Sequence, residues 1–193
     1  MIAIIGATDL ELKKLKKIYD NVYTFGIGLT TTAYNLTKFI YANKKRLKKI
    51  FMLGIGGGFK KRTNLLDICI ATEEINADFG ININDEIEKI DDNTISLENH
   101  VDLLCDECKR GRFISVNCVT TNKKILEFYE KKYSPICENM EGYAAAYVCK
   151  REKIDFYEIR VISNYVGERE NWKINKAVEI LYEVGKNIIK KYA

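Results

Sequence analysis

The chain is organised around one stretch, Glu138-Asn139-Met140-Glu141-Gly142-Tyr143-Ala144-Ala145-Ala146-Tyr147-Val148-Cys149. Its pattern predicts an extended segment that turns into a helix at Gly142, with Glu141 at the turn. The free N–H groups and the dipole of a helix start favour a carboxylate there, and the run of alanines lets the helix pack closely against a sheet. Glu141 is therefore either a simple helix cap or a functional carboxylate, and segments elsewhere in the chain favour the second interpretation.

Length and composition are those of an ordinary folded domain. The chain has 193 residues, of which 47% are hydrophobic and 30% charged, and this length predicts one domain that spans residues 1–193. No apolar run is as long as a membrane span, and Met1 leads directly into the strand-like Ile2–Ile5, so we expect no signal peptide, no membrane contact and a cytoplasmic location. The net charge of +4 is spread over mixed helix faces, which argues against nucleic-acid binding.

The cysteines and the single histidine narrow the chemistry. The six cysteines do not resemble a disulfide framework in a chain of this length, and Cys69 and Cys149 fall in apolar patterns that predict small buried residues. Cys105 and Cys108 form a C-x-x-C pair without a second pair or a nearby histidine, which disfavours a metal site. The only histidine is His100, so a histidine-based triad and a histidine-rich metal centre are excluded. We expect no metal.

Apolar strands alternate with amphipathic helices along the chain. Strands are predicted at 2–6, 22–28, 50–55, 66–75, 113–119 and 156–163. Helices are predicted at 10–18, from 30–32 to about 40, at 97–109 and 123–133, from 142 onward, and at 172–192. The polar region 82–99 is predicted to be a surface loop with room for a short hairpin. This alternation indicates a single α/β domain, with a central mixed, largely parallel sheet flanked by helices.

Polar or glycine-rich residues follow four of these strands. They lie at residues 6–11, 54–59, 139–142 and 163–165, and ligands of such sheets collect at the carboxyl ends of the strands. None of the four matches a P-loop, and the glycines at 56–58 lack the spacing of a dinucleotide-binding turn. Taken singly, each glycine cluster is as well explained by a tight turn.

Taken together, these segments resemble the purine nucleosidase and nucleoside phosphorylase family. The resemblance rests on Gly6-Ala7-x-x-x-Glu11, the glycine-rich loop after the third strand, Met140-Glu141-Gly142 and Ile162-Ser163-Asn164. The family includes the methylthioadenosine/S-adenosylhomocysteine nucleosidases. Within it, Ile162–Val166 with Arg169, Asn171 and Trp172, and residues 72–80, are most similar to the futalosine hydrolases. The resemblance extends from Ile2 to the last helix and implies a nucleoside phosphorylase-like fold, no cofactor, and a homo-oligomer (a dimer or tetramer) acting on a small nucleoside.

The resemblance also implies roles for single residues. Glu11 is expected to orient and deprotonate a water molecule, and Glu141 to accept hydrogen bonds from the ribose hydroxyls as positive charge develops on the sugar. Met140 is expected to lie against the sugar as an apolar surface. The structural alternatives are that Glu11 is only a carboxylate at a helix N-terminus and that Met140 is only a residue of the hydrophobic core. Further candidates for substrate binding are Gly56, Gly57, Phe79 and Tyr165.

Asn164 is expected to contact the leaving base. Relatives that act on adenine nucleosides carry an aspartate at the matching place. An amide instead donates its NH2 to a 6-oxo group and accepts from a protonated N7, so Asn164 predicts a 6-oxopurine leaving group. The alternative is an asparagine that caps a turn at the strand end.

The expected reaction is hydrolysis of futalosine to hypoxanthine and dehypoxanthinyl futalosine, a step of menaquinone synthesis. Alternatives are a methylthioadenosine/S-adenosylhomocysteine or aminofutalosine nucleosidase, a purine nucleoside phosphorylase, and a non-catalytic module that binds purine nucleosides. Gly28-Leu29-Thr30 lacks the basic residue with which related phosphorylases hold phosphate. The aromatic carboxylate tail of futalosine requires an apolar wall and a cation, for which the sequence offers Phe59, Phe79, Tyr165 and Arg169 without placing them.

Overall fold

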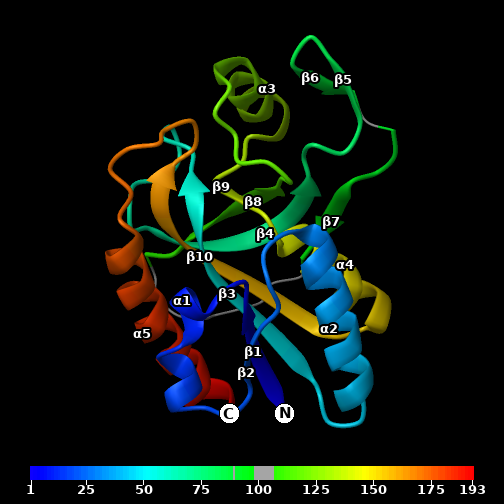
Figure 1. Cartoon of the computed structure of the whole chain (residues 1–193), viewed down its shortest axis with the longest axis vertical. Helices are drawn as coiled ribbons and strands as arrows, with labels where there is room; N and C mark the ends of the chain where they lie inside the picture. Colours follow the sequence, from blue (N-terminus) through cyan, green and yellow to red (C-terminus); the bar gives the residue numbers. More distant parts are fainter. Residues whose placement is uncertain (89, 98–106) are drawn as a thin grey trace.

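A computed structural model describes residues 1–88, 90–97 and 107–193. It is an α/β domain with one large mixed sheet and helices on two sides (Figure 1). In chain order the elements are β1 (Ile2–Gly6), α1 (Asp9–Leu12), a 3₁₀ helix η1 (Leu15–Lys17), β2 (Val22–Thr24), α2 (Leu29–Asn43), β3 (Lys49–Gly58), β4 (Ile68–Asn76), β5 (Ile81–Ile83), β6 (Glu86–Glu88), β7 (Thr94–Ser96), β8 (Lys109–Ser115), α3 (Lys123–Tyr133), β9 (Cys137–Asn139), α4 (Gly142–Glu152), β10 (Asp155–Tyr165) and α5 (Ile174–Tyr192).

Part of the sheet closes on itself. The strand order is β10-β4-β8-β9-β3-β1-β2, and β10 also pairs with β3, so β3, β10, β4, β8 and β9 form a closed ring from which β1 and β2 extend. The pairs β1–β2, β1–β3, β3–β10, β4–β8 and β8–β9 are parallel, whereas β4–β10, β3–β9 and β4–β7 are antiparallel. The predicted mixed, largely parallel sheet is confirmed, and the closure is a feature that the hydrophobic pattern did not indicate.

Strand β3 is the hub of this arrangement. Its first half pairs with β1, its last two residues pair with β9, and β10 runs beside its full length. The glycines at its end permit this crowding, because a Cβ at Gly56 would meet the Cys137 side chain and lie 3.0 Å from the carbonyl oxygen of Glu138. The glycine-rich loop predicted after the third strand is thus the end of the strand itself.

Helices cover the sheet on two sides (Figure 1). On one side α1, η1 and α5 contribute Leu12, Leu15 and Leu181 to a core shared with β1, β3 and β10. On the other side α2 and α4 contribute Leu36, Ile40 and the alanines of α4. Ala145 and Ala146 are almost completely buried, which confirms that the small residues allow close packing. No helix within the described residues is both long and apolar enough to cross a membrane.

Most predicted elements are present, with differences at their ends. The helix predicted at 10–18 is split, because Lys17 and Ile18 donate to residues three positions earlier and form the 3₁₀ helix η1. The strand predicted at 22–28 ends at Thr24, since Gly26 and Gly28 adopt positive φ angles of 91° and 90°. The strand predicted at 113–119 lies at Lys109–Ser115, β7 was not predicted, and the hairpin within 82–99 is confirmed as β5–β6.

Several predictions concern residues outside the described part of the chain. Most of the helix predicted at 97–109, together with His100 and Cys105, falls within 98–106. Cys69 and Cys149 are buried free thiols, as predicted, and Cys118 and Cys137 are also free. Cys108 is disulfide-bonded, which the expectation of reduced cysteines did not include.

A glycine inside α5 provides a test of the packing between this helix and η1. A Cβ at Gly185 would overlap the side chain of Leu15. We expect Gly185→Ala to lower the free energy of unfolding by about 1–3 kcal/mol through overpacking, although alanine is the better helix former by about 1 kcal/mol. Urea denaturation measures the change. Asn187→Ala, at an exposed position of the same helix, is the control and should be neutral or slightly stabilising. A stabilised Gly185→Ala variant would contradict the packing.

Candidate active site

The four strand ends that the sequence singled out meet at one cavity. Its volume is about 290 Å³, and its lining includes Thr8 and Glu11 after β1, Ile55–Gly57 in β3, Glu138–Glu141 at the end of β9 and just after it, and Ser163 and Asn164 in β10. The parallel strands β1, β3 and β10 bring their carboxyl ends to the same edge, as expected for a ligand site in such a sheet.

Glu11 is held at this cavity by three hydrogen-bond donors. Its Oε2 accepts from the backbone N–H of Thr8 at 3.0 Å and from the Thr8 hydroxyl at 2.8 Å. Its Oε1 accepts from the N–H of Ile55, across on β3, at 3.0 Å. Glu11 therefore supports the start of α1, as the structural alternative predicted, and is also fixed at the edge of the cavity with only 6% of its surface exposed. A carboxylate with this many fixed donors has one orientation.

Glu141 does not cap α4. Its Oε1 accepts from the N–H of Gly28 at 3.2 Å, and its Oε2 accepts from Nη1 and Nη2 of Arg160, each at 3.3 Å. The first N–H groups of the helix are bound by Asn139 instead, whose Oδ1 accepts from Glu141 at 2.9 Å and from Gly142 at 2.7 Å. The helix-cap interpretation of Glu141 is wrong, because its side chain turns away from the helix axis and into the cavity. Burial raises the pKa of Glu141, and the Arg160 charge opposes this rise.

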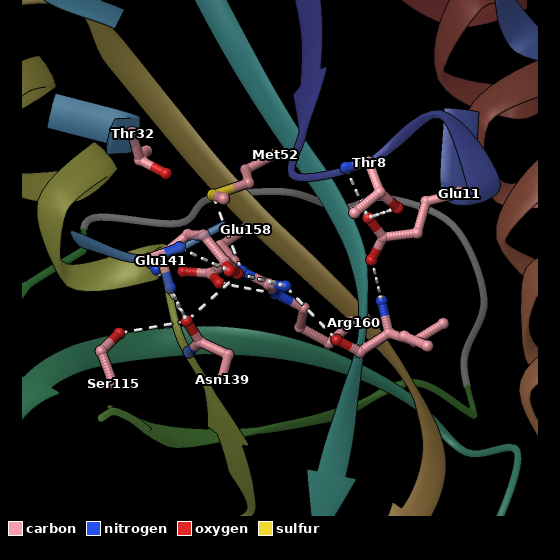
Figure 2. A network of polar contacts seen from close by, with 12 residues as sticks. Thr8, Glu11, Thr32, Met52, Ser115, Asn139, Glu141, Glu158 and Arg160 are labelled. Carbon is pink, nitrogen blue, oxygen red and sulfur yellow. Dashed lines mark hydrogen bonds and ion pairs between the residues drawn. The ribbon is translucent and has the colours of Figure 1, made fainter. Parts of the chain in front are cut away.

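Arg160 connects the carboxylates of the site (Figure 2). Its Nε donates to Glu158 Oε1 at 2.8 Å, and its Nη1 donates to the carbonyl oxygen of Ile55 at 3.3 Å. Ile55 thus binds Glu11 through its N–H and Arg160 through its C=O. Burial opposes the charged guanidinium, but Glu158 and Glu141 outweigh this effect and raise the pKa of Arg160 above its ordinary value. The residue is 1% exposed, so its charge is balanced by neighbouring carboxylates, of which Glu158 and Glu141 contribute most.

A further buried carboxyl, Glu74, lies behind this network. Glu74 accepts from Asn139 Nδ2 at 2.7 Å and from the Ser115 hydroxyl at 2.8 Å. Burial, and then the neighbouring Glu158 charge, raise the pKa of Glu74 well above its usual range. The raised pKa favours the neutral form of Glu74 beside Glu158, whose Oε2 has no hydrogen-bond partner among the described residues. A Cβ at Gly142 would overlap both carboxyl groups, which explains the glycine after Glu141.

Asn164 is oriented by its neighbours. The Ser163 hydroxyl donates to its Oδ1 at 2.9 Å, and its Nδ2 donates to the carbonyl oxygen of Tyr165 at 3.3 Å. These bonds fix which end of the amide is the oxygen. Each end keeps one further site, because Oδ1 has a second lone pair and Nδ2 a second hydrogen. Asn164 therefore presents one acceptor and one donor side by side at the cavity.

The cavity gathers most of the predicted site residues. Glu11, Gly56, Gly57, Met140, Glu141 and Asn164 line it, whereas Phe79 and Tyr165 do not. Phe79 is 48% exposed, between β4 and β5. The sequence reasoning did not identify Arg160, Asn139 or Glu138. A signal for Arg160 was present, because Glu158-x-Arg160 puts two charges on one face of an otherwise apolar strand.

Comparisons with known proteins agree with this geometry. A family model described as the phosphorylase superfamily matches residues 21–190. Comparison of the sequence with curated proteins finds no match. A futalosine hydrolase mutant of Helicobacter pylori has a TM-score of 0.83 at 18% identity, with 98% of each chain covered. A methylthioadenosine/S-adenosylhomocysteine nucleosidase of the same organism, with an immucillin ligand, has a TM-score of 0.81 at 17% identity, covering 98% of this chain and 96% of that one.

A third structure is a putative nucleosidase of the latter kind from Borrelia burgdorferi, bound to adenine. It has a TM-score of 0.79 at 23% identity, covering 98% of this chain and 99% of that one. At these identities, the likeness to the three solved structures establishes a common fold.

The Arg160 network makes a prediction about stability. Arg160→Leu leaves Glu141 and Glu158 buried without their cation, so we expect a loss of about 3–5 kcal/mol in the free energy of unfolding. Denaturant unfolding at neutral pH measures it. The matched control is Arg112→Leu, which removes the more exposed pair with Glu73 and should cost about 1 kcal/mol or less. Equal losses in the two variants would mean that Arg160 does not hold the site together.

Proposed function

Because the chain belongs to the phosphorylase superfamily, we propose that it hydrolyses the N-glycosidic bond of a purine nucleoside and that its substrate is futalosine. The observation that carries the proposal is that two buried, fixed carboxylates, Glu11 and Glu141, line the same cavity as Asn164. This set provides a base for water, a negative group for the sugar and an amide for the leaving base. The proposal includes a homo-oligomeric cytoplasmic enzyme of menaquinone synthesis.

Glu11 activates the water in this mechanism. Its carboxylate takes a proton from a water molecule while the water oxygen forms a bond to C1′ of the sugar. The bond from C1′ to N9 breaks, and its electron pair leaves with the base. Since this transition state carries positive charge on the sugar, the hydrogen bonds from the ribose hydroxyls to Glu141 strengthen as the reaction proceeds. Arg160 keeps Glu141 in place and is therefore a positioning residue.

Asn164 stabilises the departing base. Its remaining hydrogen on Nδ2 donates to the 6-oxo group, and its Oδ1 accepts from N7–H. An amide cannot supply the proton, so N7 takes it from solvent as the bond to C1′ weakens. The Tyr165 carbonyl, which can only accept, binds Nδ2 at 3.3 Å and keeps the amide from turning over to the orientation that would suit a 6-amino group. This geometry favours a 6-oxopurine over the adenine of the alternative nucleosidases.

The charges around the cavity favour water over phosphate. Arg160 is the one cationic side chain among the described residues that line it, and it is bound to Glu141 and Glu158. The segment Gly28-Leu29-Thr30 has no basic residue, and the backbone N–H of Gly28 donates to Glu141. A phosphate dianion would lie close to the Glu11 carboxylate with no free cation, so phosphorolysis is disfavoured.

The mouth of the cavity suits an aromatic tail. Leu10, Ile27 and Trp172 line it while remaining 50%, 58% and 38% exposed. The guanidinium carbon of Arg169 lies 5.8 Å from the Trp172 ring centre, which places a cation beside this apolar surface. Trp172 therefore replaces Phe59, which is buried in the core, as the proposed apolar wall for the tail of futalosine, and Arg169 remains the candidate cation for its carboxylate.

Release of free base tests the proposal directly. Futalosine, aminofutalosine, inosine and methylthioadenosine are each incubated with the protein, with and without phosphate, and bases are separated by chromatography. We expect hypoxanthine from futalosine at a rate independent of phosphate. Adenine release would assign an adenine-specific nucleosidase, and phosphate dependence a phosphorylase. Purine nucleoside binding without any release would leave only the non-catalytic module.

The role of Glu11 has its own test. Glu11→Gln keeps the size of the side chain but removes the base, so we expect turnover to fall by about 10²–10⁴-fold with substrate binding retained. Initial rates and substrate titration separate the two effects. Asp9→Asn alters a neighbouring carboxylate that pairs with Lys16 on the surface, and should leave turnover nearly unchanged. Normal turnover in Glu11→Gln would remove this residue from the mechanism.

A further inference from the structure

Glu138 is a buried carboxyl in the cavity that the mechanism above does not use. It lies in β9, is 4% exposed and lines the cavity. Its Oε1 accepts from the backbone N–H of Thr120 at 3.1 Å, whereas its Oε2 has no partner among the described residues. A carboxylate oxygen buried without a donor is costly. Such an atom at a ligand site points to a donor that the ligand brings.

The sheet register places Glu138 opposite Asn164. Gly57 pairs with Asn164 on one side and with Glu138 on the other, and paired residues direct their side chains to the same face of a sheet. The two residues are two strands apart, roughly 10 Å between Cα atoms, and both line the cavity. Gly57 between them contributes no side chain. A flat base held at one edge by Asn164 therefore directs another edge toward Glu138.

We propose that Glu138 accepts a hydrogen bond from N1–H of the leaving base and thereby selects hypoxanthine. The proposal deepens the function proposed above and rests on it, since it assumes that Asn164 binds the 6-oxo and N7 edge. Hypoxanthine carries a hydrogen on N1. Adenine has a bare lone pair there, which would face the lone pairs of the carboxylate. Glu138 and Asn164 then recognise the same tautomer from two sides of the ring.

The contact with Thr120 refines this selectivity. The Thr120 N–H already occupies Oε1, so one carboxylate oxygen remains without a donor. Hypoxanthine offers one donor at that edge, whereas guanine adds a 2-amino group for which no second partnerless oxygen is present on Glu138. Burial raises the pKa of Glu138 to about 7, with the Asp78 charge contributing, so about half of the side chains are ionised acceptors at neutral pH before a base binds. An N1–H donor favours this ionised form.

The test measures binding of free bases, which does not depend on turnover. Dissociation constants for hypoxanthine and adenine are determined by calorimetry with the wild-type protein and with Glu138→Gln. In this variant the Thr120 N–H keeps the amide oxygen at the Oε1 position, so the NH2 takes the place of Oε2 and donates. We expect the hypoxanthine-to-adenine preference to shift toward adenine by roughly 10- to 100-fold.

Glu74→Gln is the matched control. It changes an equally buried carboxyl that does not line the cavity, and it should leave the ratio of the two affinities unchanged. An unchanged ratio in Glu138→Gln, or the same shift in both variants, would overturn the role of Glu138. If hypoxanthine release from futalosine is intact in that case, the hydrolase proposal still stands. If the affinity ratio shifts in Glu138→Gln but the wild-type protein releases no base from futalosine, the proposed hydrolysis is overturned and only base recognition by Glu138 remains.

A measurement on the wild-type protein keeps the proposal testable if Glu138→Gln does not fold. 1-Methylhypoxanthine lacks the N1 hydrogen but keeps the 6-oxo group and N7. We expect it to bind at least 10-fold more weakly than hypoxanthine. Equal affinity of the two bases would show that Glu138 does not contact N1.

Discussion

A guanidinium charge buried in the middle of the domain constrains the rest of the structure. Arg160 is 1% exposed, and a charge in that position is tolerated only when it is paired and fully hydrogen-bonded. Glu141, Glu158, Asn139 and the Ile55 carbonyl meet this requirement from three segments, which are the end of β9 with its connection to α4, strand β10 and strand β3. The same groups hold the start of α4, the end of β3 and the carboxylates of the cavity. The requirement to neutralise one charge thus positions the site.

The carboxyl groups around Arg160 differ in how readily they ionise, and this difference decides where the cavity is negatively charged. Burial and the Glu158 charge raise the pKa of Glu74 well above its usual range, which favours its neutral form. Arg160 is shared by Glu158 and Glu141, whereas the hydrogen bonds of Glu11 come from N–H and O–H donors. The cavity therefore has a negative side where a sugar would acquire positive charge. Preorganised charge of this kind costs no rearrangement during the reaction, which is why the rigid network is suited to a glycosidic transition state.

Closure of the sheet explains why residues from two different strands flank β3 at the cavity. Strand β3 pairs with β10 along its length and with β9 at its tip, so residues from both neighbours reach the same cavity. Glu11 and Glu141 lie toward the strand β1 side, and Asn164 and Glu138 lie on either side of Gly57. The closing pair β10–β3 puts Asn164 on one side of Gly57, and the pair β3–β9 puts Glu138 on the other.

The sequence by itself determined the α/β alternation and most of the elements, because hydrophobic periodicity and glycine positions are local properties. It also singled out the four strand ends that meet at the cavity, and Glu11, Glu141 and Asn164 among them, through motifs that resemble a family. Tertiary structure alone decided that Glu141 turns away from its helix, that Asn139 caps α4 in its place, and that Phe79 lies apart from the cavity. It also revealed Glu138 and Arg160. These properties depend on pairings between residues distant in the chain, such as Gly57 with Glu138 and Arg160 with Glu141, and no local pattern records which segments become neighbours.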